Sequence, residues 1–424
     1  MDPKRVHKGK RMSDPTIFIS AGEASGEQYG AMLIEELQHQ LAARGRQAQF
    51  VGMGGPRMVN AGLHRIVRSE DMAVMGITEV LRHLPRIYAE YLRLKAAISS
   101  RHPAVAVLID FPDIHFKLAR EFHRHGIPVI FFVSPQLWAW KKNRIRLVQR
   151  YIDKMLVIFP FEEPFYRERG VAAEFVGHPL VDLPQPAISR ESFARASDLN
   201  ASRSWIALLP GSRAKEIGDN LPQMLAAARI LALRGPRAAG SRKEFEFIIP
   251  LAPTLNASQR KMLAGLVKHH GDGLPVRLVD DARAALLHAR ASVVASGTAT
   301  VEAALIGNPF VVVYRVSPLT YQIARRVVKV PYVAMANLIA GKMVVPELIQ
   351  ASFTAANIVR QLEPLLPDGP LRQSMIQELA RIRSLLTARP TGAGDEIETA
   401  ISRVAAITLG QLGAALPVSE SVQS

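Results

Sequence analysis

The chain contains two copies of one local pattern, in which an apolar, strand-like run is followed by a glycine-bearing loop and a helical segment. The first copy is the run 16–20 with the loop 21–26, and the second is the run 205–209 with the loop 210–213. Continuous apolar strands that alternate with helices form parallel sheets covered on both faces. Ligands of such sheets bind beyond the carboxyl ends of the strands. The pattern therefore predicts two doubly wound α/β domains of the Rossmann-like type, facing a cleft and followed by C-terminal helices.

The length of the chain agrees with two domains. Its 424 residues exceed the size at which a single hydrophobic core stops growing. Proline and small polar residues between 180 and 204 indicate a linker, and strand-like runs end near 352. The expected division in chain order is a disordered basic tail, an N-terminal domain, a C-terminal domain, C-terminal helices and a frayed tail: 1–13, 14–185, 186–352, 353–409 and 410–424.

The composition limits the kinds of partner. The chain has no cysteine, which excludes disulfides, thiolate metal sites and cysteine nucleophiles. A formal charge of +16 suits nucleic acid, an anionic bilayer or a phosphorylated substrate, but a generally basic solvated surface explains it equally well. No nucleic-acid-binding module is visible, so we expect no nucleic-acid partner. No apolar run reaches the roughly 18 residues that span a bilayer, and a soluble or peripheral protein is expected.

Several familiar motifs are missing from the sequence. The first loop has glycines at 22, 26 and 30, a spacing that differs from the dinucleotide fingerprint, and no phosphate-binding P-loop motif occurs. Neither H-E-x-x-H nor D-x-D is present. We therefore expect no cofactor and no metal. A departing nucleotide diphosphate would have to be stabilised by backbone N–H groups, helix dipoles and arginine.

Two loops of the second half are candidate phosphate sites. Gly297 and Thr298 follow the run 292–295, and Glu302 lies about one helical turn further, within reach of ribose hydroxyls. The alternative is a tight turn with Glu302 as a partner of the helix dipole. The loop Gly211-Ser212-Arg213 follows the run 205–209, where a planar guanidinium suits a diphosphate. The alternative is an exposed arginine at the start of a helix.

The first half offers carboxylates and indoles at strand ends. Asp110 ends an apolar run and is a candidate general base; the competing role of helix N-cap suits Asp113 better. Glu23 is a weaker second carboxylate. Gln136 and Trp138 follow another strand, where a cleft wall and ordinary core packing are equally good interpretations.

One predicted helix carries an apolar stripe beside basic residues. The stripe consists of Val80, Leu81, Leu84, Ile87 and Tyr88. Such a pattern is typical of a helix that lies in a membrane interface. A stripe that faces the core is the commoner arrangement, and composition does not decide between them.

Taken together, these motifs resemble those of the lipid-A-disaccharide synthases, a bacterial family of two-domain GT-B glycosyltransferases. The resemblance rests on seven stretches in order along the chain: 22–27, 54–58, 73–76, 134–140, 209–213, 296–302 and 337–341. Three positions depart from the usual family residue, which is Asp at Glu27, Pro at Ala336 and Arg at Lys342.

The resemblance implies a reaction and its participants. UDP-2,3-diacylglucosamine would donate its sugar to 2,3-diacylglucosamine 1-phosphate with inversion, giving a β-1,6 disaccharide and UDP. The N-terminal domain would be the acceptor and membrane side, and the C-terminal domain would bind UDP. Membrane lipids on the cytoplasmic face of the inner membrane are implied partners, and a homodimer is left open.

The resemblance also assigns roles to residues. Asp110 would remove the proton of the acceptor 6-hydroxyl, and Arg213 would act near phosphate. The remaining residues expected to bind substrate are Glu23, Ser25, Gly26, Gln136, Trp138, Gly211, Ser212, Gly297, Thr298, Glu302 and Asn337. Two rival functions are a UDP-sugar epimerase of the same two-domain fold and a non-enzymatic basic protein that binds membranes or nucleic acid.

Overall fold

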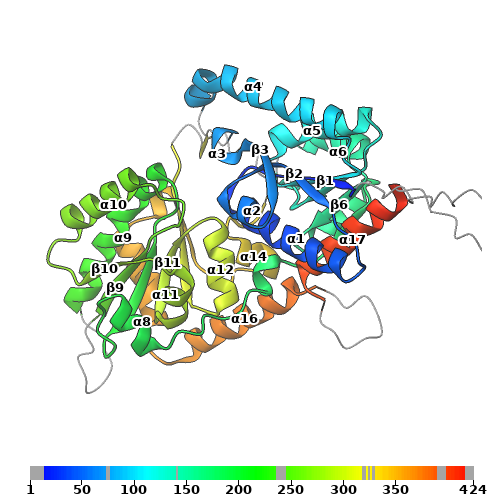
Figure 1. Cartoon of the computed structure of the whole chain (residues 1–424). Coiled ribbons are helices and arrows are strands. Elements are labelled where there is room, and N and C mark those ends of the chain that lie inside the picture. Colours follow the sequence, from blue (N-terminus) through cyan, green and yellow to red (C-terminus); the bar gives the residue numbers. More distant parts are fainter. Residues whose placement is uncertain are drawn as a thin grey trace, which may run out of the picture. The chain divides into compact units, whose positions relative to one another are not determined.

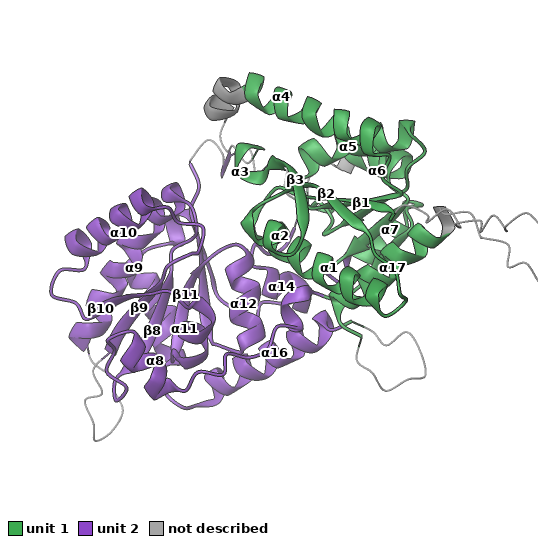
Figure 2. Ribbon diagram, viewed as in Figure 1, with its two compact units in different colours: residues 1–158, 162–177, 388–424 green, residues 159–161, 178–387 purple. Residues whose placement is uncertain are grey.

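The computed structural model describes residues 14–72, 77–139, 142–234, 245–317, 321–322, 325–326, 330–388 and 398–415. These residues form two compact units (Figure 2). The first unit comprises the chain up to Ile158, the segment Glu162–Gly177 and the chain from Ala388 onward. The second comprises Phe159–Phe161 and His178–Thr387. The expected basic tail 1–13 and the stretch 73–76 lie outside the described residues.

The first unit contains a parallel sheet in the order β3-β2-β1-β4-β5-β6-β7 (Figure 1). Its strands are β1 (Thr16–Ala21), β2 (Gln49–Gly54), β3 (Leu63–Arg68), β4 (Val105–Ile109), β5 (Val129–Phe132), β6 (Lys154–Val157) and β7 (Ala173–Phe175). All five residues of β4 are buried, because helices cover both faces of the sheet. The continuous apolar runs of the sequence therefore become central strands.

Eight helices and one 3-10 turn accompany this sheet in the described part of the unit. They are α1 (Ala24–Ala42), α2 (Pro56–Asn60), α3 (Ser69–Met72), α4 (Ile77–Arg101), α5 (Pro112–Arg124), η1 (Lys142–Arg144), α6 (Ile145–Tyr151), α7 (Glu162–Arg167) and α17 (Ala400–Ala415). α17 lies beside α1 (Figure 1). Gln40 of α1 donates to Ser402, and Arg403 pairs with Glu174 of β7 at 2.9 Å. The last helix of the chain thus completes the first unit.

The second unit repeats the topology in a sheet of order β10-β9-β8-β11-β12-β13. Its strands are β8 (Ser204–Leu209), β9 (Phe245–Pro250), β10 (Val276–Val279), β11 (Ala291–Ala295), β12 (Phe310–Tyr314) and β13 (Glu347–Ile349). Its helices are α8 (Arg190–Ala196), α9 (Ala214–Arg234), α10 (Ala257–His270), α11 (Ala282–His288), α12 (Thr298–Ile306), α14 (Met335–Ala340), α15 (Ala355–Leu362) and α16 (Pro370–Leu386). Three 3-10 turns complete the described elements: η2 (Pro179–Val181), η3 (Gln350–Ser352) and η4 (Glu363–Leu365).

Both sheets have a point at which the strand order reverses. In the first sheet it lies between β1 and β4, and in the second it lies between β8 and β11. Loops that leave two such strands turn to opposite faces of the sheet and open a crevice between their starts. The first unit therefore has a natural ligand site at the carboxyl ends of β1 and β4, and the second unit has one at the carboxyl ends of β8 and β11.

The boundaries of the units differ from those expected from composition. Apart from the short segment Phe159–Phe161, the chain passes to the second unit at Gly177/His178 and not at 185/186, and the expected C-terminal helices 353–409 are divided. α15 and α16 belong to the second unit, whereas α17 packs on the first and continues to Ala415, into the segment expected to be frayed. A proline-rich stretch marks a surface segment, which need not coincide with a change of core.

We predict that α17 is needed for the stability of the first unit. Leu412 is 1% exposed, so Leu412→Ala should lower the free energy of unfolding of this unit by about 2–5 kcal/mol. The matched control is Leu147→Ala in α6, where the leucine is 37% exposed and should matter much less. Hydrogen exchange of the β1 and β4 amides in increasing urea measures the effect. Equal protection in the two variants would contradict the prediction.

Candidate functional site

Asp110 stands directly after β4, at the point where the strand order reverses. The residue and its neighbour Phe111 both have φ of 51°. Left-handed backbone at a non-glycine residue costs on the order of 1–3 kcal/mol and is concentrated at functional sites. The surrounding structure must therefore hold these two residues in place.

The electrostatic surroundings of Asp110 suit a general base. Burial, and after it the negative charge of Glu23 in the loop after β1, raise the pKa of Asp110 to about 7. A hydrogen bond with the backbone N–H of Phe111 acts in the opposite direction. A carboxylate with a pKa near neutrality combines availability with basicity, so it transfers protons efficiently at neutral pH.

The loop after β1 is fitted to the loop after β4. A Cβ atom on Gly22 would lie 2.3 Å from the ring of Phe111, so only glycine leaves room for this ring. Gly26 is buried beside Ile109, and Ser25 is half-buried. Glu27 accepts the N–H of Arg57 at 2.8 Å, which places its carboxylate at the start of α2. The structure thus brings Glu23 and Asp110 together.

The expected N-cap role of Asp113 is wrong. The N-cap residue of α5 is Phe111, and Pro112 occupies the first helical position. Proline is favoured there because its fixed φ suits a helix and its missing N–H is not needed. Asp113 lies inside the first turn, and its Oδ1 is 2.6 Å from Nη2 of Arg144. Asp110 is therefore not the N-cap, and neither is Asp113.

The loop after β5 is held by a buried carboxylate. Oε1 of Glu162 accepts hydrogen bonds from Ser134 Oγ at 2.6 Å and from Trp138 Nε1 at 3.0 Å. Val133, at the start of this loop, has φ of 65°, which is unusual for a β-branched residue. The indole N–H of Trp138 is thus bonded to a carboxylate inside the first unit. Gln136, by contrast, is exposed. The neighbouring Trp140 and Lys141 lie outside the described residues.

The loop after β8 presents Arg213 on the surface of the second unit. Glu216 accepts from the N–H of Ser212 at 3.1 Å and from Nη1 of Arg213 at 2.9 Å. Gly211 has φ of 117°, and a Cβ there would lie 2.5 Å from the Glu216 carboxylate. The Arg213 side chain is 49% exposed, and exposed ion pairs contribute little free energy. Arg213 can therefore exchange Glu216 for a phosphate at small cost.

The loop after β11 offers a helix N-terminus and a carboxyl group. Gly297, with φ of 151°, is the N-cap residue of α12 and makes no side-chain cap. Thr298 is exposed in the first turn. Burial raises the pKa of Glu302, and the charge of Arg283 acts in the opposite direction. The N–H groups of the turn suit an anion, and Glu302 lies in the next turn of α12.

Tyr314, at the end of β12, lies near Glu216 and Arg213 of the loop after β8. Burial and the charge of Glu216 raise the pKa of its phenol, while Arg213 lowers it. This aromatic side chain beside Arg213 was not expected from the sequence. The sequence gives little indication of this role for Tyr314, because the residue simply ends an apolar run.

Asn337, which the sequence predicts to bind substrate, lies inside the second unit. The residue is 0% exposed. Its Nδ2 donates to Val345 O at 2.9 Å and to Glu347 Oε1 at 2.8 Å, and its Oδ1 accepts the N–H groups of Val344 and Val345. Because the amide is fully used inside the second unit, its role is to fix the turn after α14.

The two remaining positions that depart from the usual family residue, Lys342 and Ala336, both lie in the second unit. Lys342 Nζ lies 2.7 Å from Oε1 of Glu378, in an exposed ion pair. Ala336 is fully buried in α14.

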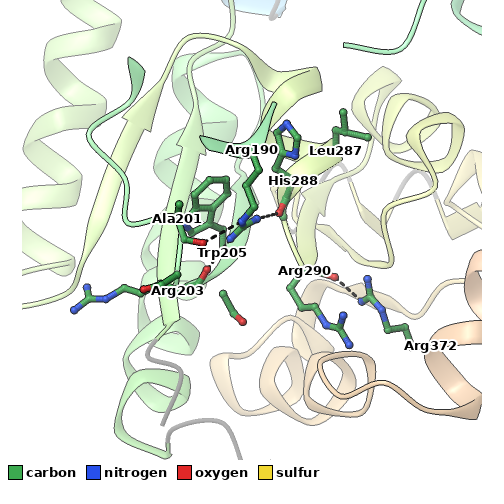
Figure 3. A pocket seen from close by; sticks show the side chains of 11 residues that line it. Arg190, Ala201, Arg203, Trp205, Leu287, His288, Arg290 and Arg372 are labelled. Atoms are coloured by element: carbon green, nitrogen blue, oxygen red, sulfur yellow. Dashed lines mark hydrogen bonds between the residues drawn. The ribbon is translucent and has the colours of Figure 1, made fainter. Parts of the chain in front are cut away.

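A hollow of about 360 Å³ lies at the opposite, amino-terminal edge of the second sheet (Figure 3). Arg190 stacks over Trp205 at 3.6 Å and donates to the carbonyl groups of Ala201, Arg203 and His288. Arg372 donates to the carbonyl of Arg290. Arg190 thus joins the chain before β8 to His288, and Arg372 joins α16 to Arg290, just before β11.

Helix α4 has two apolar faces. Ile87 packs against the core, whereas Leu84 and Tyr88 are 52% and 60% exposed. Leu92, one turn further, is 43% exposed. The side chains of Val80 and Leu81 lie outside the described residues. Within the described part of the stripe, Ile87 therefore faces the core, whereas Leu84 and Tyr88 face outward.

No group of three or more histidine, aspartate and glutamate residues could hold a metal ion in the described part of the chain. None of the helices described has the length and apolar character needed to cross a membrane.

Comparison with solved structures identifies the fold. The UDP-GlcNAc 2-epimerase from Neisseria meningitidis bound to UDP-GlcNAc superposes with a TM-score of 0.58 and 15% identity, over 94% of this chain and 100% of that one. CalG4, the calicheamicin glycosyltransferase, gives a TM-score of 0.56 and 18% identity, over 96% and 100%. At these identities the likeness shows the fold alone. It confirms the expected two-domain α/β architecture of GT-B type.

Comparison with protein families is more specific. A family model described as lipid-A-disaccharide synthetase matches residues 17–389. The lipid-A-disaccharide synthase of Acidobacterium capsulatum is 58% identical over 390 residues, which is 90% of this chain and 94% of that protein. The enzyme of Koribacter versatilis is 48% identical over 381 residues, or 88% and 94%. The chain therefore belongs to the lipid-A-disaccharide synthase family.

Proposed function

We propose that the enzyme transfers the sugar of UDP-2,3-diacylglucosamine to 2,3-diacylglucosamine 1-phosphate and releases UDP. As a family member it is a glycosyltransferase of lipid A biosynthesis, with a sugar nucleotide and a lipid phosphate as substrates. The observation that carries the mechanism is Asp110, a partly buried carboxylate with a pKa of about 7 where the first sheet reverses its order.

The proposed chemical step is a single displacement. The Asp110 carboxylate accepts the proton of the acceptor 6-hydroxyl while that oxygen forms a bond to the anomeric carbon of the donor. The bond between this carbon and the diphosphate oxygen breaks, and UDP leaves with the electron pair. Because attack and departure occur on opposite sides, the anomeric configuration inverts and a β-1,6 linkage results.

The donor side of the proposal uses the second unit. The exposed turn at Gly297 and Thr298 would receive the diphosphate, because its N–H groups and the dipole of α12 favour negative charge. Arg213 would add a guanidinium to the leaving phosphate. Glu302 would bond the ribose hydroxyls from the next turn of α12. The turn at Gly297 and Thr298 and the guanidinium of Arg213 would thus supply positive charge to the leaving group from the protein itself.

The rival functions have less support. An epimerase shares the fold, but the family match is to the synthases. A non-enzymatic binder would have no need of a strained carboxylate with a pKa near 7.

The proposed location is the cytoplasmic face of the inner membrane. Both substrates carry acyl chains, so the acceptor side must approach a bilayer. Leu84, Tyr88 and Leu92 expose apolar surface on α4, and the formal charge of +16 favours anionic lipid. A homodimer stays a prediction, which the mass of the protein in solution would test.

We predict that Asp110→Asn lowers kcat by about 10²–10⁴-fold, because the proton acceptor is removed. The measurement is UDP release and disaccharide formation, each with and without the lipid acceptor. Asp113→Asn is the matched control, since Asp113 pairs with Arg144 beside the site and should be dispensable. Full activity of folded Asp110→Asn, or UDP release without acceptor, would refute the mechanism.

The pH dependence gives an independent prediction. Asp110 must be ionised to accept a proton, so kcat/KM, which reports the free enzyme, should rise with pH through about 7 and then level off. Glu23→Gln removes a negative charge, which should lower the pKa of Asp110 and shift this rise to lower pH. Glu27→Gln, whose carboxylate is bonded at α2, is the control and should leave the profile unchanged. An unshifted profile in Glu23→Gln would count against the coupling.

The membrane surface can be tested separately. Leu84→Glu should reduce the fraction of enzyme that floats with vesicles containing anionic phosphatidylglycerol, because it adds charge to the outward face of α4. Leu147→Glu places the same charge on α6 and should bind normally. Equal binding of the two variants would exclude α4 as the contact.

A further inference from the structure

His115 is a fully buried histidine in the first turns of α5, and both of its ring nitrogens lie within hydrogen-bond distance of a partner. Nδ1 is 2.5 Å from the carbonyl oxygen of Asp110, and Nε2 is 2.8 Å from Oγ of Ser20. A carbonyl oxygen can only accept, so Nδ1 carries the hydrogen. Nε2 of the neutral ring then accepts the hydroxyl hydrogen of Ser20. Burial lowers the pKa of His115 to about 4, which keeps the ring neutral at physiological pH.

The bond from Nδ1 reaches a backbone group that the helix does not use. The N–H of His115 bonds to the carbonyl of Phe111 at 3.2 Å. The carbonyl of Asp110 lies one residue before it, and it is the ring of His115 that holds this carbonyl. The direction of the Asp110 carbonyl is set by the ψ angle of Asp110 and the φ angle of Phe111. The ring therefore acts on the left-handed pair itself.

A second contact supports the same conformation from the other side. The ring of Phe111 lies against Gly22, where a Cβ would come within 2.3 Å. It also meets the His115 ring edge-on, with centroids 5.8 Å apart. Ser20 is the residue of β1 just before the Gly22 loop and is 0% exposed. Thus Ser20 of β1 fixes the ring of His115, and the loop after β1 receives the ring of Phe111.

We propose that His115 is a positioning residue, which keeps the Asp110 carboxylate in its reactive place by holding the Asp110 carbonyl, and that Ser20 fixes the tautomer this requires. The inference rests on the proposed role of Asp110 as the base. Without the Nδ1–H donor, the two left-handed residues would relax toward ordinary backbone conformations. The carboxylate would then leave its buried place beside Glu23.

An ordinary core histidine is the competing explanation, and amide substitutions separate the two. In His115→Asn the side-chain amide nitrogen takes a place near Nδ1, so the bond to Asp110 can form while Ser20 loses its partner. In His115→Gln the amide lies near Nε2, which keeps Ser20 and loses Asp110. A core-filling role depends on volume and predicts that the longer Gln is the better replacement.

The experiment compares kcat, KM and the pH profile of His115→Asn and His115→Gln with the unmodified enzyme. We expect the Asn variant to keep kcat within about 10-fold and to keep the rise near pH 7. The Gln variant should lose about 10²-fold in kcat with little change in KM, since a small misplacement of a reacting group costs that much. Its remaining activity should rise at lower pH, because the displaced carboxylate is better solvated.

Equal kcat in the two variants, or a better Gln variant, would overturn the inference, as would an unshifted pH profile in the Gln variant. Asp110→Asn in parallel tests the proposed function separately: if it stays active, the base assignment fails whatever His115 does. A measurement on the unmodified protein covers the case of unfolded variants. Nitrogen-15 NMR should show the hydrogen of His115 on Nδ1, and a hydrogen on Nε2 would contradict the inference.

Discussion

The proposed chemistry depends on one electrostatic constraint, a carboxylate kept partly buried beside a second carboxylate. Asp110 and Glu23 come from different strands, and they meet because β1 and β4 are neighbours at the reversal of strand order. Burial and like charge both disfavour ionisation, so they bring the pKa of Asp110 into the range of a useful base. The rigid sheet and the contacts that hold the Asp110–Phe111 backbone offset the free-energy cost of keeping the two carboxylates in this arrangement.

The second unit applies the same topology to a different task. Its reversal lies between β8 and β11, and the loops there carry Arg213 and the turn at Gly297. These groups attract negative charge, whereas the first unit holds two carboxylates, Asp110 and Glu23, close together. In the proposed mechanism, one architecture would present a base in one unit and an anion-binding edge in the other. The difference arises from the loop residues, since the strand order is shared.

Much of the fold could be predicted, because buried parallel strands leave continuous apolar runs and tight loops leave glycines. Asp110 was recognisable as a polar residue at the end of such a run. The role of His115 was not, because it depends on a left-handed backbone that no local pattern reveals. Glu162 lies 28 residues from Ser134, and its contact exists only in the folded unit. Asn337 matched a family motif, but the match did not distinguish a ligand contact from a structural one.

The domain boundaries predicted from the sequence differ from those of the two units for a related reason. α17 has the apolar pattern of a packed helix, but the pattern does not say which core it joins. Its ion pair with Glu174 and its contacts with α1 place it in the first unit.

The most direct test of the central claim is the titration of Asp110 itself. Carbon-13 NMR of enzyme labelled at the aspartate carboxyl carbon, with the signal assigned through Asp110→Asn, would follow this group without substrate. The account predicts a midpoint at about pH 7. A midpoint near that of a free aspartate, about 3.9, would contradict it.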